Sequence, residues 1–192
     1  MWRYEGVETH GNAWKVKYDI QADPDPYLYA TFTLTNFTGN PKDFTLNAVL
    51  PIDPAVTGGF FAGGSVSVNL MDVVSGDEEG GSLTCLDGVE PIYMARVDDT
   101  DFHALLAAPQ SFTTAGSATT AFGSDDFGEP IPSLYSPGDI LNNIEIEINA
   151  TVGANTIAVV LATFEVTPEP ASLSLVATGL GLVILRRRRA KA

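Results

Sequence analysis

Cysteine and histidine, the residues that build many catalytic and metal sites, are almost missing from this sequence. The 192 residues include one cysteine, Cys85, and two histidines, His10 and His103. A single cysteine excludes an internal disulfide framework and any metal site made of several thiolates. Together with the two histidines it would make at most a poor zinc site. We expect Cys85 to be a small apolar residue buried in the core.

The short motifs of several enzyme classes are also missing. The sequence has no Gly-x-Ser-x-Gly elbow, no glycine-rich loop followed by Lys-Ser or Lys-Thr, and no dinucleotide-binding glycine fingerprint. Nucleophilic catalysis needs a serine or cysteine beside a positioned histidine and an orienting acid, and His103 has no nucleophile near it in the sequence. We therefore predict that the protein is not an enzyme.

Basic residues are scarce outside the C-terminal end. Residues 1–167 carry five basic residues against 23 acidic ones, a formal charge of −18, whereas residues 168–192 carry +4. Nucleic-acid affinity comes first from lysine and arginine side chains that neutralise phosphates, so nucleic acid is not an expected partner. An acidic surface of this size keeps a protein soluble and attracts cations.

Glycine, proline and β-forming residues dominate residues 1–167. The sequence holds 18 glycines and 12 prolines, and no helical run precedes residue 170. Apolar and polar residues alternate in several segments, which is the pattern of half-buried strands. The expected strands are 14–20, 27–37, 42–50, 65–74, 92–97, 144–152 and 156–166, with weaker candidates at 82–86 and 102–107. We predict an all-β fold in which six to eight strands form an antiparallel two-sheet β-sandwich over residues 1–167.

Four finer expectations accompany this fold. The runs 27–37 and 42–50 are expected to pair as a hairpin across the turn at 38–41. Glu145 and Glu147 alternate with isoleucines and are expected to face solvent. Residues 158–164 are apolar on both faces, which indicates a central strand. The Ser/Thr/Ala/Gly-rich stretch 111–128 is expected to be a long mobile loop.

The C-terminal end combines three features in a fixed order. Pro168, Glu169 and Pro170 precede an apolar run at 171–185, and Arg186, Arg187, Arg188 and Arg189 follow it. As a helix, 15 residues would cover about 22 Å, which is short of a hydrocarbon core of about 30 Å. Small residues in the run and snorkelling arginines make a single hydrophobic helix there a workable anchor. The basic cluster is expected to stay cytoplasmic, so that residues 1–167 lie outside. A buried core helix is the alternative, but the run has no polar face.

This arrangement resembles the PEP-CTERM protein-sorting signal of Gram-negative bacteria over residues 168–192. The resemblance implies export, recognition of Pro168, Glu169 and Pro170 by the membrane enzyme exosortase, and an intermediate anchored in the inner membrane through 171–185. It further implies removal of the helix and delivery to the cell surface or an exopolysaccharide matrix. Because residues 1–6 have no apolar segment, we expect the natural chain to begin upstream with a cleaved signal peptide. The segment 14–51 also loosely resembles the adhesin-like bodies that accompany this signal.

Acidic pairs and aromatic residues are the remaining candidate sites. Asp23 with Asp25, and Asp99 with Asp101, have the spacing of carboxylates that bind calcium, although neither pair forms a complete calcium loop. No other cofactor is expected. Aromatic residues are concentrated in the first 30 positions, where exposed rings would stack on sugars and buried ones would form core or cross-strand pairs. They are Trp2, Tyr4, Trp14, Tyr18, Tyr27 and Tyr29.

The sequence therefore favours a non-enzymatic, exported surface or matrix protein with a structural or interaction role. The alternative is a secreted carbohydrate-binding module or a glycoside-active protein. A cleft with two carboxylates and an exposed aromatic strip would favour the alternative.

Overall fold

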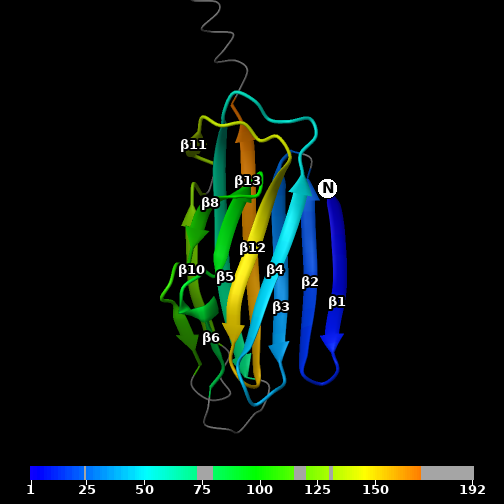
Figure 1. Ribbon diagram of the computed structural model, residues 1–192, viewed down its shortest axis with the longest axis vertical. Coiled ribbons are helices and arrows are strands. Elements are labelled where there is room, and N and C mark those ends of the chain that lie inside the picture. Colours follow the sequence, from blue (N-terminus) through cyan, green and yellow to red (C-terminus); the bar gives the residue numbers. More distant parts are fainter. Residues whose placement is uncertain (24, 73–79, 115–119, 130–131, 170–192) are drawn as a thin grey trace, which may run out of the picture.

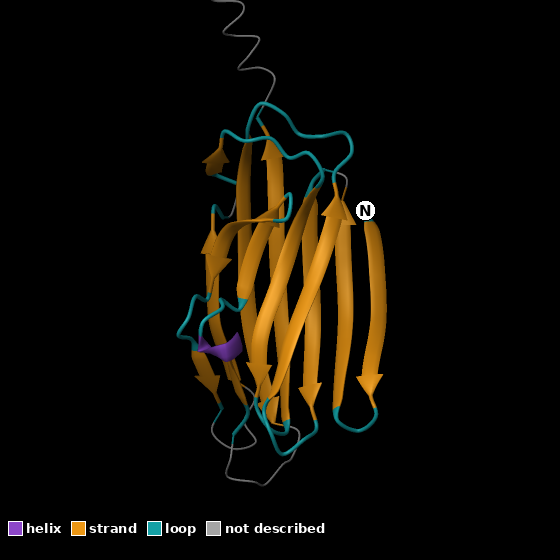
Figure 2. Cartoon of the chain, in the orientation of Figure 1, coloured by secondary structure: helices purple, strands orange, loops and turns teal. Residues whose placement is uncertain are grey.

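The computed structural model describes residues 1–23, 25–72, 80–114, 120–129 and 132–169. In these residues thirteen strands and one short 3₁₀ helix (Leu86–Gly88) build two antiparallel sheets that pack face to face (Figures 1 and 2). The predicted all-β, antiparallel two-sheet architecture is therefore confirmed. The C-terminal helix expected at 171–185 lies outside the described residues, as do Pro170 and Arg186, Arg187, Arg188 and Arg189.

The larger sheet, called sheet A here, has seven strands. Its order is β1 (Trp2–His10), β2 (Trp14–Asp23), β3 (Tyr27–Asn36), β13 (Thr156–Pro168) and β5 (Phe60–Asp72), followed by β10 (Thr120–Phe127) and β11 (Leu134–Ser136), which both pair with β5. Since β13 pairs with β3 on one edge and β5 on the other, the prediction that 158–164 is central is confirmed.

The smaller sheet, called sheet B here, is organised around β12 (Asn143–Val152). On one edge β12 pairs with β4 (Lys42–Pro51). On the other edge it pairs with β7 (Tyr93–Val97) and β6 (Ser82–Cys85), which continue to β8 (Thr100–Leu105) and β9 (Ser111–Thr113). β12 is therefore the central strand of sheet B, as β13 is of sheet A.

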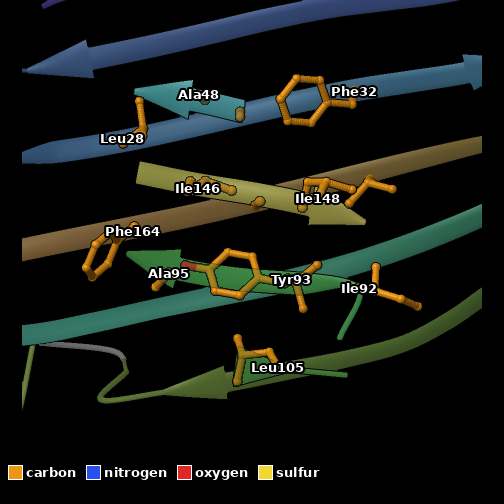
Figure 3. Packing of buried hydrophobic residues seen from close by; sticks show 14 of the residues in the cluster. Leu28, Phe32, Ala48, Ile92, Tyr93, Ala95, Leu105, Ile146, Ile148 and Phe164 are labelled. Atoms are coloured by element: carbon orange, nitrogen blue, oxygen red, sulfur yellow. The ribbon is translucent and has the colours of Figure 1, made fainter. Parts of the chain in front are cut away.

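The core lies between the two sheets and is built from alternate residues of each strand. On β12, Ile144, Ile146 and Ile148 are fully buried. Figure 3 shows Ile146 and Ile148 of β12 between Phe32 of β3 and Phe164 of β13. The buried Tyr93 donates a hydrogen bond from its hydroxyl to the Thr163 carbonyl oxygen at 2.8 Å, which ties sheet B to sheet A through the core.

The expected number of strands, six to eight, is too low. The additional strands are β1, β9, β10 and β11, and residues 111–128, expected to be one mobile loop, include β9 and β10. These strands lie at or near sheet edges, where one side needs no partner and the alternation of apolar and polar residues is weak. Eight of the nine residues of β1 are exposed, so no buried face marks this strand in the sequence.

The expected hairpin between 27–37 and 42–50 is wrong, because β3 belongs to sheet A and β4 to sheet B. The chain crosses between the sheets at Asn36, whose side chain is fully buried. Its amide donates hydrogen bonds to the carbonyl oxygens of Asn40, Val152 and Gly153 at 2.7–3.1 Å. The buried Asn36 amide thus links the crossing to the end of β12. In the sequence, the indication of this crossing was a polar residue inside an apolar pattern.

Sheet A extends beyond sheet B along one edge. In Figure 1, β1 lies beyond the diagonal β4 at this side of the molecule, with β2 next to it. Trp2 and Tyr4 lie opposite Ala22 and Ile20 in the register, so they are on the core-side face of sheet A. They are nevertheless 52% and 62% exposed. The core-side face of β1 is therefore open to solvent, and we call this part of the sheet the overhang.

Candidate functional site

The start of the predicted sorting motif lies at the end of the last strand. Pro168 is the final residue of β13 and is opposite Phe60 of β5. The backbone N–H of Glu169 donates a hydrogen bond to the Gly59 carbonyl oxygen at 3.2 Å. The first two motif residues are therefore held against the sandwich, and Pro170 lies outside the described residues.

A cleft of about 780 Å³ opens beside this point. It lies where the start of β1 meets the ends of β4 and β13, at the upper end of the molecule in Figure 1. Its lining is aromatic, aliphatic, proline-rich and acidic: Trp2, Tyr4, Asp25, Pro26, Leu50, Pro51, Ile52, Asp53, Pro54, Ala55, Val56, Thr57 and Pro168. Asp25 and Asp53 are the two charged residues among the described lining residues, which include no basic side chain, so this lining is negatively charged.

The overhang presents the aromatic wall of this cleft. Because side chains alternate between faces along a strand, Trp2 and Tyr4 project on the same side of β1. Farther along β1, a Cβ added at Gly6 would lie 2.1 Å from the Tyr18 hydroxyl oxygen, so the tyrosine ring packs over this glycine. Tyr18 also lines a second hollow of about 230 Å³ between β2 and β4, together with Glu8. The open face of the overhang therefore extends along β1 from Trp2 to Gly6 and across to Tyr18 of β2.

The other N-terminal aromatic residues have different environments. Trp14 packs against the core, with its ring 5.8 Å from that of His10 and 6.1 Å from that of Phe44. Tyr27 and Tyr29 project from the outer face of sheet A and are half-buried. Tyr27 lines a third hollow of about 400 Å³ with Asp126, Glu129 and Glu165 among its lining residues. Burial, and next the charge of Glu129, raise the pKa of Glu165 above its usual value.

The first acidic pair predicted to bind calcium closes a turn. The Asp23 carboxylate accepts a hydrogen bond from the Asp25 backbone N–H at 3.2 Å, which is the geometry of an Asx turn. Its second oxygen lies 3.7 Å from the N-terminal amine of Met1. Asp25 contributes to the cleft. A structural role accounts for Asp23, and the structure brings no third carboxylate into this turn within the described residues.

The two residues of the second predicted pair, Asp99 and Asp101, have different hydrogen-bond partners. Asp101 accepts a hydrogen bond from Arg96 Nε at 2.8 Å. Asp99 lies at the β7–β8 turn with a positive φ of 61°, and it accepts a hydrogen bond from the Asn143 side-chain amide at 3.1 Å. Asp98, the residue before Asp99, accepts hydrogen bonds from the backbone N–H groups of residues 141, 142 and 143 at 2.7–3.1 Å. The pKa of Asp98 is lowered, since these bonds outweigh the effect of its desolvation.

Glu145 and Glu147 do not face solvent as expected, because they are only 4% and 7% exposed. They project from the outer face of β12, where the side chains of β4 and β7 cover them. Val49 and Arg96 flank Glu145 in the register, and Asn47 and Met94 flank Glu147. The alternating pattern assigned the face correctly, but the position of β12 at the centre of the sheet determines the burial.

The two buried glutamates have different partners. Glu147 pairs with Arg96 at 2.6 Å and also accepts a hydrogen bond from the Asn149 amide. Among the described residues Glu145 Oε1 has no hydrogen-bond partner, and the same is true of Asn143 Oδ1 two residues earlier. Burial raises the pKa of Glu145; the charge of Arg96 opposes this, and the charges of Glu147 and Asp99 add to it. Sequence reasoning missed Asn143 and Glu145, and the acids Glu145 and Glu147 inside a central strand were the available signal.

The residues with classical ligand chemistry are dispersed. His10 ends β1, His103 is on β8 with its ring centroid 4.3 Å from that of Phe127 in a tilted contact, and Cys85 on β6 is buried. The prediction that Cys85 is a small buried core residue is confirmed. Throughout the described ranges, no three side chains of histidine, cysteine, aspartate or glutamate are grouped as metal ligands. None of the helices in those ranges is long and apolar enough to span a bilayer.

Comparison with known proteins does not identify the chain. Neither a known family model nor a curated protein sequence matches it.

Proposed function

We propose that the protein is an exported, non-enzymatic module of the cell surface or extracellular matrix that is sorted and processed through its C-terminal segment. The observation that carries this proposal is the order of Pro168, Glu169 and Pro170, the apolar run 171–185 and the arginines 186–189. It resembles the PEP-CTERM signal, for which exosortase is the processing partner. Positive charge after an apolar segment favours retention of that end in the cytosol.

The fold supports this reading in one respect. β13 ends at Pro168, so the sorting segment follows the last strand without an intervening linker. Because the Glu169 amide is bonded to Gly59, an enzyme that binds the motif as an extended peptide must first detach it from the end of sheet A.

Processing in cells tests the first function. The full chain, preceded by a secretion signal and tagged at both ends, is expressed in a bacterium with and without an exosortase gene. With the enzyme, the N-terminal tag should appear outside the cell without the C-terminal tag. Replacement of Pro168, Glu169 and Pro170 by alanine should retain the intact chain in the membrane, whereas Pro137→Ala should be processed normally. An intact chain in the cytosol would refute the proposal.

A second function, binding of a glycan, is favoured by the cleft beside the overhang. Trp2 and Tyr4 present exposed rings, and sugar rings stack on aromatic faces. Asp25 and Asp53 line the same cleft, and their carboxylates could accept hydrogen bonds from sugar hydroxyl groups. Since the cleft has two carboxylates and no basic lining residue, it disfavours anionic polysaccharides and suits neutral or amino sugars.

Titration with defined oligosaccharides tests the second function. The full chain in detergent is titrated with cellohexaose, with chitohexaose and its deacetylated form, and with alginate oligomers, while the heat of binding is recorded by isothermal titration calorimetry. We expect binding of neutral or amino-sugar chains and none of alginate. Trp2→Ala and Tyr4→Ala should each weaken binding about tenfold or more, in the range of one lost stacking contact. Phe37→Ala removes an exposed ring outside the cleft and serves as the control. Preference for alginate, or insensitivity to both cleft variants, would exclude this function.

A further inference from the structure

We propose that Asp99, Asn143 and Glu145 form the protein part of a calcium site on the outer face of sheet B, at the end of the β7–β8 turn. The proposal goes beyond sorting and glycan binding. This site keeps only Asp99 from the predicted calcium pair, because Asp101 is bound to Arg96. Its two further oxygen ligands come from Asn143 and Glu145 of β12.

Two buried oxygens without partners are the first observation. Glu145 is 4% exposed, and its Oε1 has no hydrogen-bond partner in the part of the chain that the structure describes; there, Asn143 Oδ1 is also buried and unpartnered. Burial of an unsatisfied polar atom costs about 1–3 kcal/mol, and more for a charged group. A cation that bound both oxygens would remove this cost.

Their positions allow the two oxygens to converge. Asn143 and Glu145 alternate with Ile144, so both project from the outer face of β12, with Cα atoms about 6.8 Å apart. The Asn143 amide nitrogen bonds to Asp99 Oδ1 at 3.1 Å, which fixes the Asp99 carboxylate beside the same face. The charge of Asp99 also contributes to the raised pKa of Glu145, as expected for neighbouring carboxylates.

The charge balance of this face is the second observation. This face and the adjoining β7–β8 turn carry five carboxylates and one arginine: Asp98, Asp99, Asp101, Glu145, Glu147 and Arg96. Arg96 is bound to Asp101 and Glu147. Asp98 is satisfied by three backbone N–H groups. Among the described residues neither Asp99 nor Glu145 forms an ion pair, although the charge of Arg96 acts on Glu145 from across the register. A divalent cation would neutralise the remaining excess of negative charge.

The ligand chemistry selects calcium. The three residues offer carboxylate and amide oxygens, which are hard ligands, and no sulfur or imidazole ligand belongs to the set. Calcium accepts six to eight oxygens in flexible geometry, so two carboxylates, one amide and water molecules make a site of modest affinity. A dissociation constant of about 10⁻⁴–10⁻³ M, as in extracellular modules, is expected.

Calcium titration of the full chain in detergent, after removal of metals with EDTA, tests the proposal. At 10 mM Ca²⁺ we expect the melting temperature to rise by about 3–8 °C, since only the folded state holds the three ligands together. Calorimetry should give one site. Glu145→Gln and Asp99→Asn should each reduce affinity at least about tenfold, because each removes a charged ligand from a site of this kind.

A matched control uses the other predicted acidic pair. The double variant Asp23→Asn, Asp25→Asn removes two carboxylates from the β2–β3 turn and should keep the full calcium response. Circular dichroism in EDTA confirms that each variant is folded before titration. No response of the native sequence to 10 mM Ca²⁺, an undiminished response in Glu145→Gln and Asp99→Asn, or an equal response to Mg²⁺ would overturn the proposal.

Discussion

The two central strands, β12 and β13, occupy equivalent positions but bury their outer faces differently. On β13, Ile157, Val159 and Leu161 project outward and are only half-buried. On β12, the charged Glu145 and Glu147 project outward and are almost fully buried. The polarity of these residues alone would predict the opposite order of burial.

The neighbours of each strand explain the difference. Leu161 lies between Thr31 and Ser67 in the register, whose short side chains leave it half-open. Glu145 lies between Val49 and Arg96, whose larger side chains cover it. Burial on an outer face therefore depends on the size of cross-strand neighbours, and a sequence pattern along one strand does not contain that information.

The largest expected effect comes from the inner face of β12. Ile146→Ala should lower the free energy of unfolding by about 2–5 kcal/mol, because the isoleucine is fully buried and alanine leaves a cavity. Val159→Ala, on the half-buried outer face of β13, should cost about 1 kcal/mol or less. Urea denaturation of both variants measures the contrast. Equal losses would show that the outer face of β13 is as tightly packed as the core.

The second effect concerns the ion pair on the outer face of β12. Arg96→Met keeps the bulk of the side chain but leaves Glu147 and Asp101 without their cation, so the free energy of unfolding at pH 7 should fall by about 2 kcal/mol. Adding Glu147→Gln should restore part of the loss. A double-mutant cycle with no coupling between Arg96 and Glu147 would contradict a role for this pair in stability.

A smaller effect is expected on the outer face of β13. The Thr163 hydroxyl accepts a hydrogen bond from the Ser65 backbone N–H at 2.9 Å and lies 2.8 Å from the Ser65 hydroxyl. Thr163→Val removes both contacts and should cost about 1 kcal/mol. Thr163→Ser keeps the hydroxyl and is the matched control. Chemical denaturation that gives the same loss for both variants would assign the effect to packing.

The smallest expected effect is a gain in stability, and it depends on pH. The pKa of Glu145 is raised above 4.5, mainly by burial, so the folded state favours the protonated form. The stability linked to this proton is fully present below the unfolded pKa and is lost as the pH rises through the folded pKa. In EDTA at pH 7, Glu145→Gln should therefore melt slightly higher than the native sequence, and the difference should disappear near pH 4. Thermal melts across this range in EDTA would count against the assignment if the variant melted lower at pH 7.

Much of the fold follows from the sequence because period-2 alternation is strong where one face is buried. The strands predicted at 144–152 and 156–166 agree with β12 and β13 within a few residues. The edge strands β1 and β10 were missed because their pattern is weak: β1 is exposed on both faces, and β10 carries polar residues along sheet A. The assignment of β3 and β4 to different sheets depends on Asn36, whose bonds reach residues more than 100 positions away.

The candidate sites were only partly predictable for the same reason. Trp2 and Tyr4 were recognised as aromatic candidates, but the cleft beside them also needs the end of β4 and the loop at 52–57. Asp99 was recognised from its spacing, whereas Asn143 and Glu145 reach it only through the pairing of β12 with β7. Contacts between distant segments decide both sites, and local patterns do not encode them.

The place where the chain leaves the fold has a mechanical consequence. β13 is hydrogen-bonded to β5 along its whole length and to β3 along most of it, and it ends at Pro168. If the C-terminal segment is tethered while the rest of the molecule is pulled, the force runs along this strand and loads its two ladders in shear. Many hydrogen bonds must then break together. A pull that peels off the exposed edge strand β1 would instead break its single ladder one hydrogen bond at a time. We therefore expect β13 to resist a pulling force better than β1 does.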